Sequence, residues 1–363
     1  MAEPKPRKKA KVIDFDRRRY AAFKIAYLGG AYDGFAIQEN TPNTVEGKLF
    51  EALAKATLIK DFHSSGYSRC GRTDKGVSAL GNAVSLYVRS RAGHALGEYD
   101  YVTIVNKLLP EDIRLVSYCY PDESFDARFS CLYREYKYFF CLEDMDFSQL
   151  CASVGRYRGE HDYRNFCKMD IVNVSNFRRR IVSARVERLT EAGPMTMCVL
   201  TLRGFAFLWH QVRCMAAVLF LIGLGKEAPE VIDKLLDIEA NPQKPTYDLA
   251  PEAPLLLYDC GFESVDFLSE PEALNRTYET FAAGLSRHSC TIAMYSTILG
   301  HFDRTLLTSG RLLSDSRADL VSRSSKVYTP LLFRPRTETY EDRVGGLKGK
   351  KAARKAEKVR PKA

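Results

Sequence analysis

The sequence predicts an α+β (α/β) protein in which helices pack on β-sheet. Alternating apolar segments typical of strands are interleaved with segments whose apolar residues recur at helical spacing. The chain has 363 residues, of which 45% are hydrophobic and 27% charged. That is long enough for two domains or one large two-part unit. Because strand–helix–strand patterns occur on both sides of residue 150, we expect two similar halves with helices on a sheet face.

The expected strands are short runs of alternating or strongly apolar residues. They are Tyr20–Leu28, Ala83–Val88, Ile113–Tyr120, Cys131–Leu142, Arg178–Leu189, Met195–Arg203 and Leu255–Cys260. The expected helices have an apolar face at helical spacing and are Asn43–Ile59, Tyr99–Leu109, Phe147–Val154, Phe207–Leu224 and Pro229–Asp237. Asn43, followed three residues later by Glu46, resembles a capping box at the first of these helices.

Composition divides the chain further. Residues 1–19 and 344–363 are expected to be disordered basic tails, because each is dense in Lys and Arg. Residues 20–145 and 146–263 form the two halves. Residues 264–343 are expected to be a helical extension, chiefly over Glu272–Leu285 and Thr291–His301.

The net charge of +9 is concentrated in the tails. The first twenty residues hold eight Lys/Arg against three Asp/Glu, and the last twenty hold eight against one. Such tails favour an anionic partner such as nucleic acid, although solvated termini that only aid solubility would look the same. The basic run Pro4–Lys11 also suits a nuclear import signal. We therefore expect a location in the nucleus, the cytoplasm or both.

Other classes of protein are disfavoured. The longest apolar run, near Ala216–Leu224, is too short to cross a bilayer, and the charged first twenty residues do not resemble a secretory signal. The ten cysteines contain no C-x-x-C pair, and the six histidines lack metal-ligand spacing. We expect reduced thiols, no metal site and no membrane segment.

The chemistry is expected in the glycine-punctuated stretch Gly66–Ala79. Gly71 and Gly76 allow a sharp turn that presents Arg72 and Asp74. A neighbouring guanidinium favours the ionised form of an aspartate, and an oriented carboxylate can act as a nucleophile or a base. An ordinary turn with a surface ion pair is the alternative interpretation.

Three further patterns carry candidate residues. Arg134, Tyr136 and Tyr138 share one face of an expected strand and would suit base stacking and phosphate contacts, or simply a half-buried strand. His161 and the aspartate after it could be a catalytic pair, or could brace a turn. Arg213 is a cation near the start of an apolar helix; it needs a carboxylate partner if buried, and Asp74 is a candidate.

Five stretches, in their order along the chain, resemble motifs of the TruA-type tRNA pseudouridine synthase family. Cys70–Ala79 resembles the signature G-R-T-D-x-G-V. The other four are Arg134–Tyr138 (R-x-Y-x-Y), Gly159–Phe166 (G-x-H-D-F-x-x-F), Phe207–Arg213 (F-L-x-x-x-V-R) and Ala250–Leu257 (A-P-x-x-G-L-x-L). The resemblance extends over roughly residues 20–262.

This resemblance implies a fold and a set of roles. It implies two halves with mixed or antiparallel sheets that meet at a central basic cleft flanked by helices, usually in a homodimer. Asp74 would be the catalytic carboxylate, acting on C1′ or on the C2′ proton, and Arg213 would hold it ionised. The remaining implied contacts are stacking by Tyr136, packing by Leu255, filling of the vacated space by Arg72, and weaker substrate contacts by Lys75, His161 and Phe166.

The stretch Leu28–Asn43 and the ending Tyr328–Arg343 resemble the eukaryotic branch of this family. That branch isomerises uridine at positions 38 and 39 in the anticodon stem-loop of tRNA, and the reaction requires no cofactor. Two rival functions stay open: a glycoside or nucleoside hydrolase, which would usually need a second carboxylate, and a non-catalytic RNA-binding protein.

Overall fold

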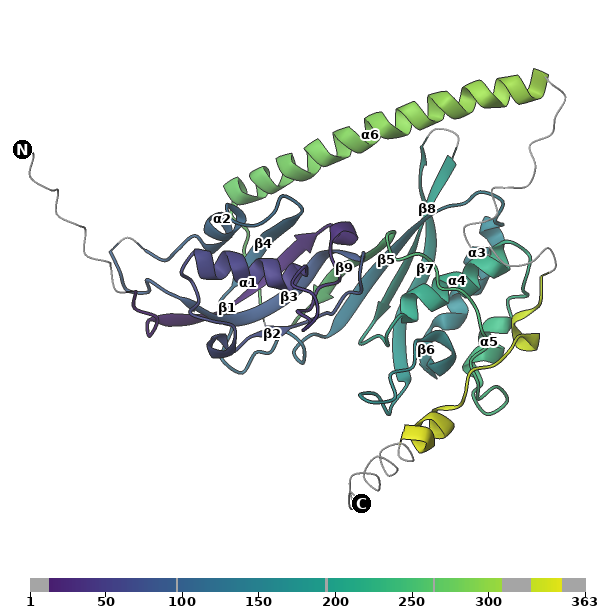
Figure 1. Ribbon diagram of the computed structural model, residues 1–363, viewed down its shortest axis with the longest axis horizontal. Helices are drawn as coiled ribbons and strands as arrows, with labels where there is room; N and C mark the ends of the chain where they lie inside the picture. Colours follow the sequence, from purple (N-terminus) through teal and green to yellow (C-terminus); the bar gives the residue numbers. More distant parts are fainter. Residues whose placement is uncertain (1–12, 96, 193–194, 264, 309–327, 348–363) are drawn as a thin grey trace, which may run out of the picture. The chain divides into compact units, whose positions relative to one another are not determined.

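The computed structural model describes residues 13–95, 97–192, 195–263, 265–308 and 328–347 (Figure 1). The chain forms two compact units. Unit 1 comprises the chain up to Lys75, Ala79–Cys131 and Phe262–Ala283, and unit 2 comprises Gly76–Ser78, Leu132–Gly261 and the chain from Gly284. The units divide at residue 131 and not near 145, because the fifth strand pairs with later strands of unit 2.

The sheet of unit 1 is antiparallel. Strand β1 (Arg18–Tyr27) lies between β4 (Ile113–Cys119) and β3 (Ser78–Arg89), and the short β2 (Ser68–Arg69) pairs with β3. The two longer strands are nearly continuous runs of buried residues, as expected for strands covered on both faces. β1 begins at Arg18, so the predicted disordered tail is too long; residues 1–12 lie outside the described part.

Two helices belong to unit 1. α1 (Val45–Lys55) buries Leu49 and Leu53 and is capped by Thr44, whose hydroxyl accepts the Gly47 N–H. The predicted Asn43 cap is therefore wrong by one residue. The Asn43 side chain donates instead to the carbonyl of Ala31. α2 (Tyr101–Asn106) lies beside β4 (Figure 1), tied to it by the Asn106 amide, which bonds both the N–H and the C=O of Leu115.

The sheet of unit 2 is also antiparallel. Its strand order is β9-β5-β8-β7-β6, with bounds Leu255–Gly261, Tyr133–Cys141, Met195–Gly204, Arg178–Ala192 and Gly159–Asp162 respectively. The predicted β7–β8 hairpin is confirmed, although residues 193–194 at its tip lie outside the described part. β6 occupies what the sequence predicted as loop, because its four residues pair with the start of β7.

The helices of unit 2 pack against this sheet. α3 (Phe147–Val154) lies beside α4 (Gln211–Gly223), and a short α5 (Val231–Leu236) follows (Figure 1). Every residue of α4 except Arg213 is buried. The sequence predicted this helix from Phe207, four residues early, since the apolar pattern continues into the preceding loop. His210, in the left-handed region at φ 61°, marks the actual start.

The chain ends differently from the predicted helical extension. α6 (Pro271–Thr308) is one continuous helix that includes both of the stretches with the strongest helical pattern, Glu272–Leu285 and Thr291–His301. Residues 328–343, here called the C-terminal strap, are mostly non-helical and pack on unit 2, with Leu331 fully buried and the Thr246 N–H donating to Pro335. Residues 340–347 form a short α-helix, so the predicted disordered tail is helical at 344–347, and residues 348–363 lie outside the described part. None of the described helices has the length and apolar character that a membrane span needs.

Candidate active site

The Gly66–Ala79 loop is held just before Asp74 by buried polar groups of unit 1. The fully buried Asn82 accepts the Gly71 N–H at 3.0 Å and donates to the Gly71 carbonyl at 3.1 Å. Thr73 shares a hydrogen bond of 2.8 Å with the Tyr27 hydroxyl. Paired backbone and side-chain groups of this kind fix a loop, because leaving them unpaired in the interior is costly.

A second anchor holds the start of the loop. Glu46 on α1 is fully buried; it accepts the Ile37 N–H at 2.7 Å and pairs with Arg69, which stands immediately before Cys70. The sequence assigned Glu46 only to helix capping. Its actual role depends on a partner 23 residues away, which a local pattern does not reveal.

The glycine-rich loop at Gly29–Gly34 lies against the catalytic loop. Gly34 has φ 103°, and a Cβ atom there would meet the Thr73 carbonyl oxygen at 3.0 Å. The Phe35 N–H donates to the same carbonyl. Sequence patterns did not predict that the Gly29–Gly34 loop supports the Gly66–Ala79 loop.

The candidate residues of unit 1 differ in exposure. Asp74 is half-buried, whereas Arg72 and Lys75 are exposed. Lys75 pairs with Asp33 at 2.8 Å, and this hydrogen bond is the largest cause that lowers the pKa of the Asp33 carboxyl. The structure thus supplies an ion-pair partner for Lys75 that sequence reasoning missed, and its substrate contact stays a prediction.

In unit 2, Arg213 is a largely buried guanidinium with defined partners. Its Nε donates to the Ala250 carbonyl at 2.7 Å and its Nη2 to Glu252 at 2.9 Å, with 12% of the side chain exposed. The pairing of Arg213 with Asp74 stays a prediction, and the carboxylate that the structure describes beside Arg213 is Glu252. The sequence missed it, although Glu252 lies within the Ala250–Leu257 motif.

The last turn of the loop is shaped around that ion pair. Gly76, which belongs to unit 2, has φ 78°, and a Cβ atom there would lie 2.8 Å from Cγ of Glu252. Only glycine fits such a close approach at positive φ. The glycine of the G-R-T-D-x-G-V signature therefore has a packing reason as well as a conformational one.

Tyr136 and Leu255 lie on adjacent strands of unit 2. Tyr136 on β5 is half-buried, and its ring meets that of Phe207 edge-on at 5.0 Å. Tyr138, two residues on, is buried and donates to Pro251. Leu255 is 5% exposed at the start of β9. Tyr136 thus keeps part of its ring accessible, as Tyr133 and Phe139 of the same strand also do.

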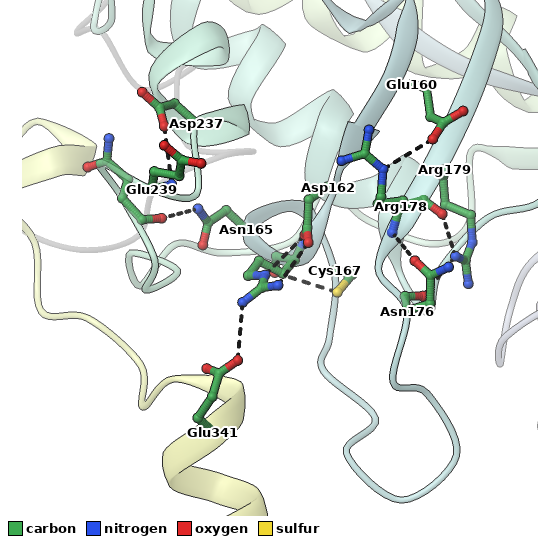
Figure 2. A network of polar contacts seen from close by, with 12 residues as sticks. Glu160, Asp162, Asn165, Cys167, Asn176, Arg178, Arg179, Asp237, Glu239 and Glu341 are labelled. Carbon is green, nitrogen blue, oxygen red and sulfur yellow. Dashed lines mark hydrogen bonds and ion pairs between the residues drawn. The ribbon is translucent and has the colours of Figure 1, made fainter.

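The His161–Asp162 pair is a structural brace. Asp162 binds the Arg164 guanidinium with both oxygens and also accepts the Arg164 N–H, and Figure 2 shows this carboxylate within a wider polar network. His161 bonds the Arg158 carbonyl at 3.0 Å. Phe166 is fully buried against Tyr157. Phe166 therefore supports its surroundings from within, and the predicted RNA contact by its side chain is not available in this structure.

His210, the residue before α4, has a strongly lowered pKa. Burial, followed by the nearby charges of Arg213, Lys168 and Lys244, lowers the pKa of His210 to about 4. The imidazole is therefore neutral near pH 7. None of the ten cysteines is in a disulfide.

Comparison with known proteins defines the class. The sequence model of a family described as tRNA pseudouridine synthase matches residues 154–263. A relative named tRNA pseudouridine synthase A, from Methanothrix thermoacetophila, is 33% identical over 68% of this chain and 84% of its own length. Together with the loop signature and the relatives below, these matches show that the chain belongs to the TruA-type tRNA pseudouridine synthase family.

Within that family the similarity is more specific. The tRNA pseudouridine(38/39) synthase of Homo sapiens is 40% identical over 93% of this chain and 79% of its own length. The protein of the same name from Saccharomyces cerevisiae is 39% identical over 91% of this chain and 79% of its own.

Proposed function

We propose that this chain isomerises uridine to pseudouridine at positions 38 and 39 in the anticodon stem-loop of tRNA. The observation that carries the proposal is the G-R-T-D-x-G-V loop, held around Asp74 by Asn82, Thr73 and Gly34. The names of the relatives at 39–40% identity supply the substrate and the two positions.

The reaction breaks the N1–C1′ bond of uridine and joins C5 to C1′. N1 gains a proton and C5 loses one, so nothing is oxidised and no group leaves. Asp74 either attacks C1′ or removes the C2′ proton. The chemistry asks for one oriented carboxylate and a route for the C5 proton, and it requires no cofactor.

The other residues orient the base and the carboxylate. Arg213, fixed by Glu252 and Ala250, supplies positive charge, and only two peptide units separate Asp74 from Gly76, which packs on Glu252. Tyr136 stacks on the uracil, and its hydroxyl moves the C5 proton. Leu255 packs beside that ring.

Arg72 fills the space that the uridine leaves when it turns out of its stack, which a stem position requires. Lys75 and His161 contact the RNA backbone. Basic residues of both tails add affinity that falls with salt.

Asp74→Asn tests the catalytic assignment. We expect it to abolish tritium release from C5-labelled tRNA while tRNA binding persists, because the amide can neither attack C1′ nor accept the C2′ proton. Asp61→Asn, at an exposed loop carboxylate of the same unit, is the matched control and should be fully active.

Near-normal release by Asp74→Asn would refute the assignment. Free uracil in the wild-type reaction would instead favour a nucleoside hydrolase. Bound tRNA with no conversion by wild-type protein would favour a non-catalytic RNA-binding protein.

We also propose that the protein is a homodimer that pairs through α6. Large apolar side chains recur along this helix, first at seven-residue spacing and from Ile292 at alternating three- and four-residue spacing, and are 41–75% exposed: Tyr278, Leu285, Ile292, Tyr295, Leu299 and Phe302. This is the seam of a coiled coil. An exposed apolar face of such length is unusual for a monomer.

The seam suits a second copy of the same chain. The flanking positions are small or uncharged: Ala282, Gly284, Ser289, Thr291 and Ser296. No charge there repels an identical helix. In an antiparallel pair, Leu285 of one copy would face Tyr295 of the other.

The double variant Leu285→Glu/Ile292→Glu should turn a dimer into a monomer in light scattering. His288→Glu/Ser296→Glu would do so less strongly, because neither side chain is a large apolar one. A wild-type monomer at micromolar concentration would reject the dimer.

The location in the nucleus or cytoplasm is likewise proposed, on the basic run Pro4–Lys11, and a fluorescent fusion with and without that run tests it.

A further inference from the structure

The loop between β8 and α4 presents aromatic rings to solvent. Trp209, the single tryptophan of the chain, is 45% exposed, and Phe205 is 48% exposed. Leu208 between them is buried, and its N–H donates to the Gln211 side chain at 2.8 Å. The left-handed backbone at His210 follows directly. The loop thus has a fixed anchor and exposed rings on either side of it.

A cation lies against each exposed ring. The Lys168 ammonium is 4.1 Å from the Trp209 ring centroid, and the Lys168 N–H donates to the Trp209 carbonyl at 2.9 Å. The Arg180 guanidinium is 5.6 Å from the Phe205 ring. Across the described residues, no carboxylate forms an ion pair with either cation. Among the described residues, their charge is therefore not neutralised by a direct acidic partner.

The same loop reaches the proposed catalytic ring. Phe207, between the two exposed aromatics, packs edge-on against Tyr136 at 5.0 Å. Arg134 donates to the Phe205 carbonyl at 2.8 Å. All of these residues belong to unit 2, and the contacts of Phe207 with Tyr136 and of Phe205 with Arg134 connect the loop to β5.

We propose that Trp209 is a stacking platform for an unpaired nucleobase next to the target uridine, with Lys168 contacting its phosphate. Phe205 and Arg180 form a second, similar step. An exposed aromatic ring with an adjacent cation is the arrangement that binds unpaired nucleotides, since the ring takes the base and the cation the backbone. The inference rests on the proposed function, because turning a uridine out of its stack exposes the faces of its neighbours.

The single tryptophan gives a direct test on the full-length protein. We expect a synthetic anticodon stem-loop RNA to quench the intrinsic tryptophan emission saturably, because a stacked base quenches indole. Heparin, which carries negative charge but no bases, should bind without that quenching. Unchanged emission at saturating RNA would overturn the proposal, and so would equal quenching by heparin.

Variants test the energetic contribution. Trp209→Leu should weaken stem-loop binding about tenfold, within the range found when one base–aromatic stack is removed. Trp209→Phe should recover most of that loss, because it keeps a ring. Phe333→Leu removes an aromatic that is 81% exposed on the strap and should leave binding unchanged.

Lys168→Gln should reduce the slope of log affinity against log salt by roughly 0.7–0.9, the value for one phosphate contact. Equal affinity of Trp209→Leu and the wild-type protein for the stem-loop RNA would overturn the proposal, whatever the stability of Trp209→Phe. Pseudouridine formation by the wild-type protein is measured in parallel. If pseudouridine forms but RNA does not change the Trp209 emission, only the stacking platform is rejected. If no pseudouridine forms, the proposed function is rejected.

Discussion

Replacing Asn82 with alanine should release the catalytic loop from its buried anchor. The substitution removes the two hydrogen bonds of 3.0 and 3.1 Å to Gly71. A buried backbone group left unpaired costs about 1–3 kcal/mol, so losing both partners should lower the local free energy of opening by about 2–4 kcal/mol. A loop displaced by about 1 Å would in addition reduce turnover on the order of 100-fold.

Amide hydrogen exchange at Gly71 measures the first effect directly. A loss of 2–4 kcal/mol corresponds to roughly 30- to 1,000-fold faster exchange there, while amides of the unit 2 core should be unaffected. Turnover on tRNA measures the second effect. Asn173→Ala, at an exposed loop asparagine of unit 2, is the control and should change stability by less than about 0.5 kcal/mol. Normal exchange at Gly71 together with normal turnover in Asn82→Ala would refute this account of the loop.

Three other perturbations follow from the same geometry. Gly76→Ala places a Cβ against Glu252 at φ 78°, so it should destabilise by about 1–2 kcal/mol and lower turnover; an unchanged melting temperature would contradict this. Glu46→Ala leaves Arg69 without its buried partner and should lower the free energy of unfolding by about 3 kcal/mol. Denaturant unfolding measures this loss, with Glu46→Gln as the comparison variant. Because the pKa of His210 is lowered to about 4 in the fold, the unfolded chain binds more protons between pH 4 and 6.5. Stability should be complete above pH 6.5 and fall by roughly 1–2 kcal/mol toward pH 4 for this half-buried ring, and His210→Gln should flatten that dependence.

Local sequence patterns predicted the helices and strands, but not the distant side chains that hold the candidate site residues in place. Phe147–Val154 is a helix with the bounds that its apolar spacing predicted, and Asp74 could be proposed from its own loop alone. Asn82 looked like one more residue of a strand, and Glu252 like part of a Pro-rich connection. Their roles depend on partners 11 and 39 residues away, and no spacing rule marks such pairs.

Where prediction of boundaries failed, tertiary contacts had overridden the local pattern. The apolar side chains of Phe207 and Leu208 continue the helical pattern of α4. The helix nevertheless starts later, because Phe207 packs on Tyr136 and His210 adopts a left-handed backbone. The strap was predicted as helix, although its backbone pairs instead with residues 244 and 246. Competition between local spacing and distant backbone partners cannot be judged from one segment alone.

The strap is attached to unit 2 by many separate contacts. The Leu331 N–H and the Tyr328 hydroxyl donate to Glu227, Thr337 donates to Lys244, and the Tyr340 ring packs on Phe177. A protease cut anywhere in residues 309–327 should therefore yield two fragments that copurify under native conditions and separate only in denaturant. A synthetic peptide of residues 328–347 should in the same way rescue a chain that was expressed without them.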